Sequence, residues 1–521
     1  MSASRTVTSL LDGRPVEGAP GGSLTIANPA DLGTTVAEAR LGDAGTFLEA
    51  CRRAAGAQPS WATVPAPVRG RAIQHLGRLV EDNAETLSQL ITREIGKPIR
   101  ESRGEVQEVV DTCTFFLGEG RRLYGQTVPS EMPDKQLFTF RSPVGVAAIV
   151  TAGNFPVAVP SWYLVPALLC GNAVVWKPAE YAPATAEAFA QLILHAGFPS
   201  ATFQLVLADG AQTFEGMARA LDDRVLHKVG FTGSSEVGRR IGELCGRHLQ
   251  SPCLELGGKN PLVVMPDADL DLAVEGALFS GFGTAGQRCT SLGTAIVHRD
   301  VHDDFLARFS KATDAPIGDP TRDVLFGPMI SARFCERFEG WLELIRPHHA
   351  VSGSEGIGRI RPDNPRTGFV GDPETGLYYH PVIVDGVTID DDLYRTETFG
   401  PIVGVSSFDT FDQAMELANA HGYGLTSSIY TNDPVHVFRF RDQISAGMVS
   451  VNNSTSGAEA HLPFGGNGRS GNGSRQSGPW VLDQFTRWQA MNWDYSGHLQ
   501  KAQMDTAELE ADSAFRLAAD G

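Results

Sequence analysis

Positive charge is scarce in this sequence of 521 residues, which has 43 lysines and arginines against 61 aspartates and glutamates and a formal net charge of -18. A protein that binds nucleic acid needs a basic surface, because contacts to phosphates supply most of the affinity. The composition therefore predicts no nucleic-acid partner and favours a small-molecule substrate.

Cysteine is also scarce, and the seven cysteines form no close-set pairs and show no CxxC spacing. An odd and scattered set argues against a disulfide framework and offers no zinc-binding pattern, so we expect a reducing compartment and no metal centre. The first residues, MSASRTVTSLLDGRPVEGAPGG, lack the apolar segment of a signal peptide. Cytoplasmic residence is therefore the expectation.

The sequence contains no uninterrupted hydrophobic run of membrane-spanning length. Residues 144–176 are uncharged and long enough to span a bilayer. The residues that interrupt them are Asn154, Pro156, Pro160, Pro166 and Asn172. The segment divides into strand, turn, helix and strand, which predicts a buried α/β core and no membrane partner.

The pattern along the chain predicts an α/β protein with two or more domains, because 521 residues exceed what one core usually supports. Residues 67–95 and 99–123 have helical periodicity. Strand-like runs alternate with helical segments over 136–233 and again from about 259, the pattern of parallel sheets flanked by helices. Residues 351–376, rich in Gly, Pro, Asp and Arg, are expected to form a surface excursion.

Two expected strand ends carry residues suited to a nucleotide. KVGFTGSSEVG passes from a strand into a helix, where Gly233 permits a tight turn and Ser234 with the first amides either faces a phosphate or only begins the helix. WKPAEYAP places Lys177 and Glu180 at another strand end, which suits ribose hydroxyls or a solvated ion pair. The patterns alone leave both alternatives open.

Three residues have chemistry that is unusual for their surroundings. Asn154 lies in an apolar run, where its amide either closes a turn or stabilises an oxyanion. Glu255 lies between apolar residues, which favours a raised pKa and a general base, or else a bond to a neighbouring amide. In GTAGQRCTS, Cys289 lies beside Arg288 and is either a buried apolar thiol or an activated nucleophile.

In combination these motifs resemble the aldehyde dehydrogenase superfamily over about residues 25–490. The stretches that carry the resemblance occur in the family's order, namely NFP with GNAVVWKPAE, FTGSSEVG, LELGGKNP followed by DADLD, GQRCT, ETFGPI and PFGGNGRSGNG. The resemblance implies a Rossmann-like coenzyme domain (1–130 and 148–258), an α/β catalytic domain (259–460), an oligomerisation flap of β-strands (131–147 and 478–497) and a C-terminal tail (498–521). That tail is mobile or forms a short helix on a neighbour, and the implied assembly is a homodimer or homotetramer.

The same resemblance implies a mechanism. Cys289 would attack an aldehyde, Asn154 and the Cys289 amide would hold the oxyanion, and Glu255 would activate the water that hydrolyses the thioester to a carboxylic acid. A coenzyme A-acylating relative is disfavoured because Glu255 is present. A non-catalytic structural protein on this fold is the alternative of another class, and it would be expected to lack Cys289, Glu255 or Asn154.

The implied coenzyme is NAD, because a carboxylate at position 180 would repel the 2′-phosphate of NADP, although some relatives accept both. The residues implied to contact the coenzyme are Lys177, Glu180, Gly233, Ser234, Leu256, Glu397 and Phe399.

Within the superfamily the sequence most resembles the aminoadipic semialdehyde dehydrogenases. The shared stretches are GEVQE followed by Val110 and Asp111, NFPVAV, LLCGN, GTAGQRCT and STSGAEA. The implied substrate is L-2-aminoadipate 6-semialdehyde, in equilibrium with piperideine-6-carboxylate, and the product is 2-aminoadipate. Gly153 replaces a large aromatic residue, and HLPFGGNGRSGNG is typical of more general enzymes. Aliphatic, succinic and aromatic aldehydes therefore stay as alternatives.

This branch also implies how the amino acid end of the substrate is recognised. Glu108 and Arg288 would bind the two charges of a zwitterion, with the backbone of Gly457 and Ala458 on its carboxylate. The simpler alternatives are a solvated helix face for Glu108 and a structural ion pair for Arg288.

Overall fold

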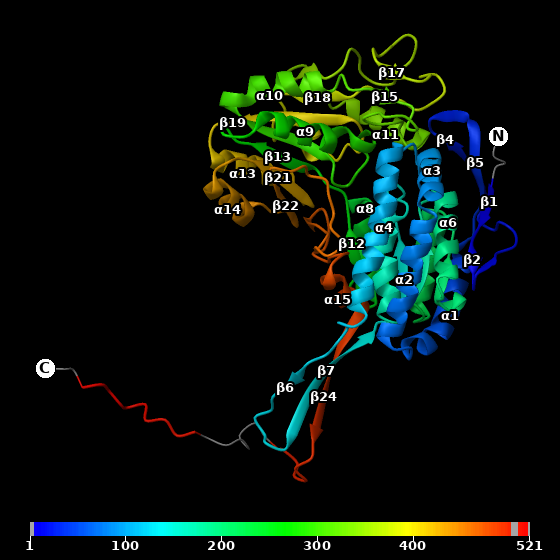
Figure 1. Ribbon diagram of the computed structural model, residues 1–521, viewed down its shortest axis with the longest axis vertical. Helices are drawn as coiled ribbons and strands as arrows, with labels where there is room; N and C mark the ends of the chain where they lie inside the picture. Colours follow the sequence, from blue (N-terminus) through cyan, green and yellow to red (C-terminus); the bar gives the residue numbers. More distant parts are fainter. Residues whose placement is uncertain (1–4, 502–508, 519–521) are drawn as a thin grey trace.

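The computed structural model describes residues 5–501 and 509–518, and it contains two large sheets covered by helices (Figure 1). The α/β class with parallel sheets that was expected from the alternating strands and helices is confirmed. Part of the expected C-terminal tail, residues 502–508 and 519–521, lies outside the described residues, and residues 509–518 contain no helix or strand.

The first sheet has seven strands in the order β12-β11-β8-β9-β10-β2-β3. The strands are β2 (Leu10–Leu11), β3 (Arg14–Pro15), β8 (Val146–Val150), β9 (Ala173–Lys177), β10 (Phe203–Leu205), β11 (Lys228–Thr232) and β12 (Cys253–Glu255). Strands β12 to β10 are parallel, so their carboxyl ends share one edge of the sheet. Lys177, Gly233 and Glu255 lie at that edge.

Helices from the N-terminal half cover this sheet. They are α1 (Ala44–Ala62), α2 (Ala66–Asp82), α3 (Ala84–Ile95), α4 (Ile99–Glu119), α5 (Ala158–Leu169), α6 (Pro183–His195), α7 (Gly210–Asp222) and α8 (Ser235–Arg247). A small sheet of β1 (Arg5–Thr8), β5 (Asp31–Arg40) and β4 (Ser23–Asn28) lies beside them.

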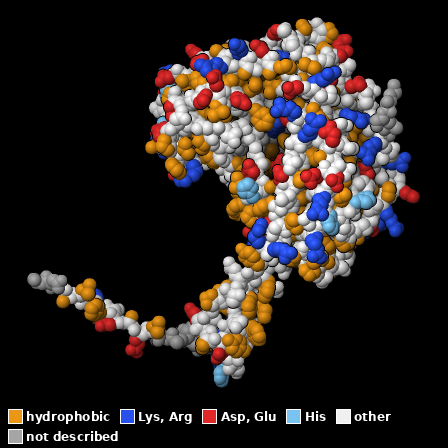
Figure 2. Space-filling view, viewed as in Figure 1, with side chains coloured by type: hydrophobic (Ala, Val, Ile, Leu, Met, Phe, Trp, Pro, Cys, Tyr) orange, Lys and Arg blue, Asp and Glu red, His pale blue; other side chains and the backbone are white. Residues whose placement is uncertain are grey.

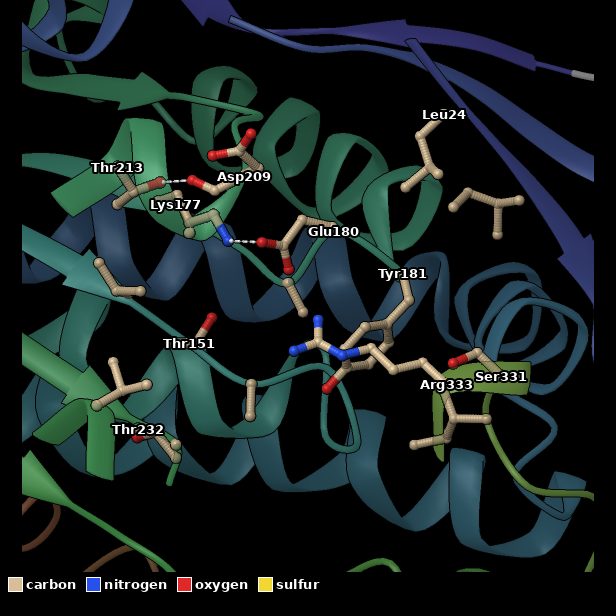
Figure 3. Close-up of a pocket in the computed structure, with 18 of the residues that line it drawn as sticks. Leu24, Thr151, Lys177, Glu180, Tyr181, Asp209, Thr213, Thr232, Ser331 and Arg333 are labelled. Carbon is tan, nitrogen blue, oxygen red and sulfur yellow. Dashed lines mark hydrogen bonds and ion pairs between the residues drawn. The ribbon is translucent and has the colours of Figure 1, made fainter. Parts of the chain in front are cut away.

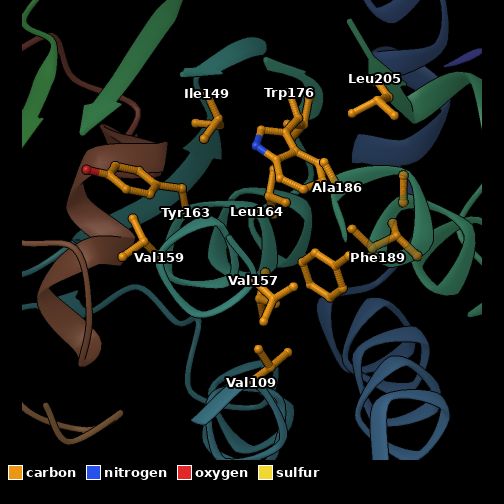
Figure 4. Packing of buried hydrophobic residues seen from close by; sticks show 14 of the residues in the cluster. Val109, Ile149, Val157, Val159, Tyr163, Leu164, Trp176, Ala186, Phe189 and Leu205 are labelled. Atoms are coloured by element: carbon orange, nitrogen blue, oxygen red, sulfur yellow. The ribbon is translucent and has the colours of Figure 1, made fainter. Parts of the chain in front are cut away.

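The uncharged segment 144–176 forms β8, α5 and β9, as expected. Every residue of α5 is buried. Figure 4 shows Tyr163 and Leu164 of this helix packed among Ile149, Trp176 and Val109, which come from both strands and from α4. The run is apolar because protein surrounds it on all sides. Among the residues that the structure describes, no helix combines the length and apolar character needed to cross a membrane.

The second sheet also has seven strands, in the order β16-β18-β19-β14-β13-β21-β22. The strands are β13 (Asn260–Val264), β14 (Leu292–His298), β16 (Ala350–Ser352), β18 (Val382–Asp385), β19 (Ile402–Phe408), β21 (Thr426–Tyr430) and β22 (Met448–Val451). Its helices are α9 (Leu270–Phe282), α10 (Arg299–Ala312), α11 (Ala332–Leu342), α12 (Asp392–Arg395), α13 (Phe411–Asn419) and α14 (Pro434–Gln443).

Short elements connect these layers. They are β15 (Ile317–Gly318) paired with β17 (Phe369–Val370), β20 (Tyr423–Gly424) paired with β23 (Asn467–Gly468), and the short helices η1 (Ser200–Thr202), η2 (Gly283–Gly286), η3 (Pro479–Val481) and α15 (Leu482–Phe485). Most of the expected excursion at 351–376 consists of turns and bends.

A three-stranded antiparallel arm projects from the body (Figure 1). It consists of β6 (Thr127–Val128), β7 (Lys135–Pro143) and β24 (Thr486–Asp494). Trp488, Met491 and Trp493 are 52%, 44% and 54% exposed on β24, and Figure 2 shows hydrophobic side chains gathered on the arm. Exposed apolar surface of this kind is typical of a face that another chain covers.

Candidate active site

Two cavities of the described chain are lined by residues expected at the site. One, of about 920 Å³, follows the carboxyl ends of the first sheet. The other, of about 650 Å³, is enclosed by α4, α5, the Cys289 segment and residues 456–458. Cys289 lines the second cavity, which makes that cavity the place where a substrate would meet the thiol.

Lys177 and Glu180 lie together in the larger cavity (Figure 3). Lys177 Nζ is 3.1 Å from a Glu180 oxygen, and the lysine is buried whereas the glutamate side chain is 29% exposed. Met217, Val237 and Ile241 add an apolar wall. A carboxylate anchored by a buried lysine beside an apolar slot suits the ribose hydroxyls and the base of a nucleotide, so the residues present fit the coenzyme that the resemblance implies.

Gly233 and Ser234, in the strand-to-helix turn after β11, have different surroundings. Gly233 lines the larger cavity, whereas the Ser234 hydroxyl accepts the Val237 amide (3.4 Å) and caps α8. The side chain of Ser234 therefore begins the helix, one of the two alternatives that the pattern left open. Leu256 packs against Gly238 of the same helix, where a Cβ would overlap the leucine.

Glu255, which is buried, and Glu397, which is half-buried, form an acidic pair beside Cys289. Burial, followed by the charge of Glu397, raises the pKa of Glu255 well above its ordinary value, and Glu255 Oε1 has no hydrogen-bond partner among the described residues. Burial also raises the pKa of Glu397 to about 7, although the Gly258 amide, which donates to its Oε1 (3.0 Å), opposes the shift. A carboxyl group poised in this way can exchange a proton near neutral pH.

The two glycines after Glu255 are required by close packing. A Cβ at Gly257 would overlap the Glu397 carboxylate, and one at Gly258 would lie 2.5 Å from the Cys289 carbonyl oxygen. The Leu-Glu-Leu-Gly-Gly stretch therefore brings the acidic pair against the backbone of the cysteine. Phe399, which follows Glu397 and has a φ of 44°, packs its ring 5.8 Å from that of Phe334.

Cys289 differs from the other six cysteines of the described chain, because they are buried and it is partly exposed. Desolvation and the carboxyls of Glu255 and Glu397 raise the pKa of its thiol well above the ordinary value. The thiol is thus neutral at rest, and it can reach a ligand in the smaller cavity.

The residues that precede Cys289 adopt a left-handed turn. Thr284 and Ala285 have φ values of 52° and 54°, and Gly286 has 69°. Each non-glycine residue in this conformation costs about 1–2 kcal/mol. Such a turn persists only where its surroundings hold it.

The Asn154 side chain reaches the same turn. It is buried, and its Nδ2 donates to the carbonyl of Gln287 (2.9 Å), two residues before the thiol. The amide therefore does not close a turn of its own segment. It lies against the backbone of the cysteine segment, where its second N–H can face an oxygen bound at Cys289.

Ion pairs surround the smaller cavity. They are Arg288–Glu101, Arg100–Asp323 at 3.6 Å, and the fully buried Lys97–Glu105 behind the lining. Glu108 lines the cavity, and its Oε1 has no hydrogen-bond partner in the described part of the chain. Burial and then Glu105 raise the pKa of Glu108 to about 8, although the charge of Lys97 and a hydrogen bond from Trp162 oppose the shift. Among the described residues Glu108 is therefore a lining acid that forms no ion pair.

Arg288 lines the cavity and also forms a structural ion pair with Glu101. Its Nη2 donates to Glu101, its Nε donates to Thr284 (3.3 Å), and its guanidinium lies 4.5 Å from the centre of the Phe279 ring. Gly457 and Ala458 also line the cavity. The structure thus brings all four expected recognition residues to one cavity, but Arg288 enters it with its charge already neutralised.

Sequence reasoning missed Glu101, although a signal was present. Glu101, Glu105 and Glu108 are spaced at i, i+4 and i+7, which places three carboxyls on one face of the expected helix. An acidic stripe on a face that also carries Val109 and Thr112 indicates burial with partners.

The packing around position 153 explains why a glycine stands there. A Cβ there would lie 2.7 Å from the Tyr181 ring and 2.9 Å from Ala179, and the Gly153 amide donates to the Tyr181 hydroxyl (3.1 Å). Tyr181 thus fills the space that a large side chain at position 153 would need.

His348, His349 and Asp391 place their possible ligand atoms within 4.8 Å of one another, away from both cavities. His349 Nδ1 accepts the Arg346 amide (3.0 Å), so the neutral ring carries its proton on Nε2. That nitrogen has no lone pair for a metal in this orientation, and it lies 3.4 Å from Asp391 Oδ2.

Comparison with known proteins gives one consistent result. The model of the aldehyde dehydrogenase family matches residues 16–491. Alpha-ketoglutarate semialdehyde dehydrogenase of Haloferax volcanii is 34% identical over 91% of this chain and 96% of its own length, and the alpha-aminoadipic semialdehyde dehydrogenase of Bos taurus is 35% identical over 90% and 85%.

Two solved structures extend that result to three dimensions. An NAD-dependent aldehyde dehydrogenase from Sinorhizobium meliloti has a TM-score of 0.89 at 29% identity, covering 96% of both chains. Betaine aldehyde dehydrogenase from Staphylococcus aureus in complex with NAD+ has a TM-score of 0.88 at 27% identity, covering 94% of this chain and 96% of that one.

Proposed function

Because the chain belongs to the aldehyde dehydrogenase family and is an NAD(P)-dependent oxidoreductase, we propose that its substrate is an aldehyde with an amino acid at the far end. The best candidate is L-2-aminoadipate 6-semialdehyde, which it would oxidise to 2-aminoadipate. The family and the NAD coenzyme expected from the sequence are confirmed.

One observation carries the choice of substrate. Arg288, Arg100 and Lys97 each form an ion pair with a carboxylate, whereas Glu108 forms no ion pair among the described residues and its Oε1 accepts no hydrogen bond there. A half-buried acid of this kind is stabilised by an ammonium group, which would supply the missing charge and the missing hydrogen bond. The substrate carboxylate would then lie against the backbone of Gly457 and Ala458.

Several relatives are named for semialdehyde substrates, but those substrates differ at the end that lies away from the aldehyde. Some are named for alpha-ketoglutarate semialdehyde or 2,5-dioxopentanoate, and others for alpha-aminoadipic semialdehyde. The former name describes a keto acid with no ammonium group, which would leave Glu108 without a counter-charge. Glu108 therefore supports the aminated substrate.

The chemistry proposed for the chain's own residues follows from their positions. Cys289 Sγ adds to the aldehyde carbon, and Asn154 with the Cys289 amide stabilises the oxygen of the thiohemiacetal. When bound, NAD would supply the acceptor for the hydride of this carbon, and the hydroxyl proton would pass to solvent, which leaves a thioester on Cys289. Glu255 then takes a proton from the water that attacks the thioester, which releases the carboxylic acid and restores the thiol.

Lys177 and Glu180 would hold the ribose of the coenzyme, and Gly233 with the start of α8 would lie near its phosphates. Glu397 accepts the Gly258 amide and lies close enough to Cys289 to raise the pKa of its thiol, so that Glu397 and the nearby Phe399 would orient the reacting end of the coenzyme. Ser234 and Leu256 would contact the coenzyme through their backbone atoms, because the Ser234 side chain caps α8 and the Leu256 side chain packs against α8.

The proposal is tested by comparing kcat/KM for a panel of aldehydes with NAD and with NADP. The panel holds aminoadipate semialdehyde, 2,5-dioxopentanoate, succinic semialdehyde, butanal and benzaldehyde. Aminoadipate semialdehyde is expected to be the best substrate. A wide preference for 2,5-dioxopentanoate, succinic semialdehyde or benzaldehyde would show that Glu108 does not select an ammonium group.

Glu108→Gln is expected to raise KM for aminoadipate semialdehyde by about 10- to 100-fold, because the half-buried carboxylate is the proposed partner of the ammonium group. KM for butanal should change little. Because the pKa of free Glu108 is about 8 and the ammonium group binds the ionised form, wild-type KM should fall as pH rises from 6 to 8. The variant should lose that slope, and dividing wild-type by variant values at each pH cancels the cyclisation of the substrate.

Asn154→Ala is expected to lower kcat by about 10²- to 10³-fold and to leave KM nearly unchanged, because an oxyanion donor acts mainly in the transition state. Steady-state kinetics with butanal and NAD measure both. The thermal unfolding midpoint must be followed as well, since the amide also holds the Gln287 carbonyl. An unchanged kcat would assign Asn154 to that structural bond alone.

We further propose that the arm of β6, β7 and β24 joins subunits into a homodimer or homotetramer, supported by its exposed Trp488 and Trp493. Cytoplasmic residence is supported by seven free cysteines in the described chain.

A further inference from the structure

Glu101 makes more contacts at the active site than any role assigned above explains. Its Oε1 accepts the Thr284 amide (3.1 Å), and its Oε2 accepts both the Thr284 hydroxyl and Arg288 Nη2. One carboxylate of α4 thus binds the first residue of the left-handed turn and the residue next to the nucleophile.

We propose that Glu101 is a positioning residue that ties the turn before Cys289 to α4 and, by neutralising Arg288, determines which semialdehydes the cavity accepts. The second half of this inference rests on the proposed function, because it concerns the far end of the substrate.

The positioning role follows from the backbone. Residues 284 and 285 are non-glycine residues in the left-handed region, and their conformation needs an external restraint. Glu101 supplies that restraint, because it satisfies both the amide and the hydroxyl of Thr284. Arg288 closes the ring of contacts through its bond to the same hydroxyl (3.3 Å), so that Thr284, Arg288 and Glu101 hold one geometry.

The specificity role follows from charge. Arg288 is 6% exposed and the Glu101 side chain 15%, so water screens neither group well. Although burial raises the pKa of Glu101, Arg288 and Thr284 outweigh that effect and lower it, which keeps the carboxylate ionised at neutral pH. With Arg288 neutralised, a substrate whose far end is purely anionic meets no free cation, while Glu108 stays available to an ammonium group.

Glutamine at position 101 separates the two roles. Glu101→Gln keeps an oxygen for the Thr284 amide and removes the charge, whereas Glu101→Ala removes both. The matched control is Glu85→Gln, which breaks a paired glutamate–arginine contact to Arg103 on the exposed side of α4, at 2.9 Å.

The measured quantity is kcat/KM for succinic semialdehyde divided by kcat/KM for butanal. Glu101→Gln is expected to raise this ratio about tenfold, with a lower KM for the anion, because Arg288 becomes an unpaired cation in the cavity. Glu85→Gln should leave the ratio unchanged. Glu101→Ala is expected to lower kcat for butanal about tenfold or more, because the turn that presents Cys289 loses its restraint.

A double variant tests whether the unpaired charge of Arg288 causes the change in the ratio. In Glu101→Gln with Arg288→Gln both charges are gone, so the ratio should return toward the wild-type value. If Glu101→Gln does not fold, Arg288→Gln alone should leave the carboxylate unpaired and lower the ratio.

Two results would overturn the inference: a ratio that stays constant in Glu101→Gln and Arg288→Gln, or a kcat for butanal that Glu101→Ala leaves unchanged. Neither measurement uses aminoadipate semialdehyde, so a failure of the substrate proposal and a failure of this inference are distinguishable.

Discussion

Replacing Cys289 by alanine is expected to abolish NADH formation, with kcat falling by on the order of 10⁴-fold or more. Alanine cannot form the thiohemiacetal, and no other cysteine of the described chain is exposed at the cavity. NADH absorbance under single-turnover conditions measures the loss. Binding of NAD, followed by quenching of protein fluorescence, should persist because the larger cavity does not contain the thiol.

Cys335→Ala is the matched control for this loss. Cys335 is also a free cysteine, but it is buried on α11 and lines neither cavity. The control should keep kcat within a few-fold of wild type. NADH formation in Cys289→Ala at the wild-type rate would remove Cys289 from the mechanism.

Glu255→Gln is expected to give a burst of NADH and then to stall. The thiohemiacetal and hydride steps do not need Glu255, whereas hydrolysis of the thioester needs a base to take a proton from water. Steady turnover should therefore fall by about 10²- to 10⁴-fold. Rapid mixing resolves the burst, and mass spectrometry after acid quenching should find the acyl group on Cys289.

The pH dependence gives a second test of Glu255. Because burial and Glu397 raise the pKa of Glu255, and the ionised form is the base, wild-type steady turnover should rise with pH through that pKa. The variant should lack the rise. Glu243→Gln, on an exposed face of α8, is the control that should retain both the rise and the rate. Full steady turnover in Glu255→Gln would assign the water-activating step to another group.

Alternation of strands and helices was enough to predict the fold class, because each local period reports which face of an element is buried. Residues 144–176 show the same point, since the order strand, turn, helix and strand that was expected there is the order of β8, α5 and β9 in the structure. At Ser234 the pattern did not distinguish a helix cap from a phosphate ligand, because both roles favour a small hydroxyl residue at a helix start.

The recognition residues show that a local sequence pattern does not predict which charged side chains pair in the folded chain. Glu108 and Arg288 were expected to act as a pair of opposite charges, yet the structure gives Arg288 an ion-pair partner in Glu101 and gives Glu108 no ion pair among the described residues. The partners lie 187 positions apart in the chain. No spacing rule connects residues at that separation.

The sequence by itself determined the chemical groups, the elements that carry them and, through motifs in the family's order, the reaction. Those properties depend on residue type and on neighbours within a few positions. Only the tertiary structure decided which charges are neutralised, because a buried charge is governed by the groups that packing brings within a few ångströms, and α4 meets the turn before Cys289 only in the folded chain.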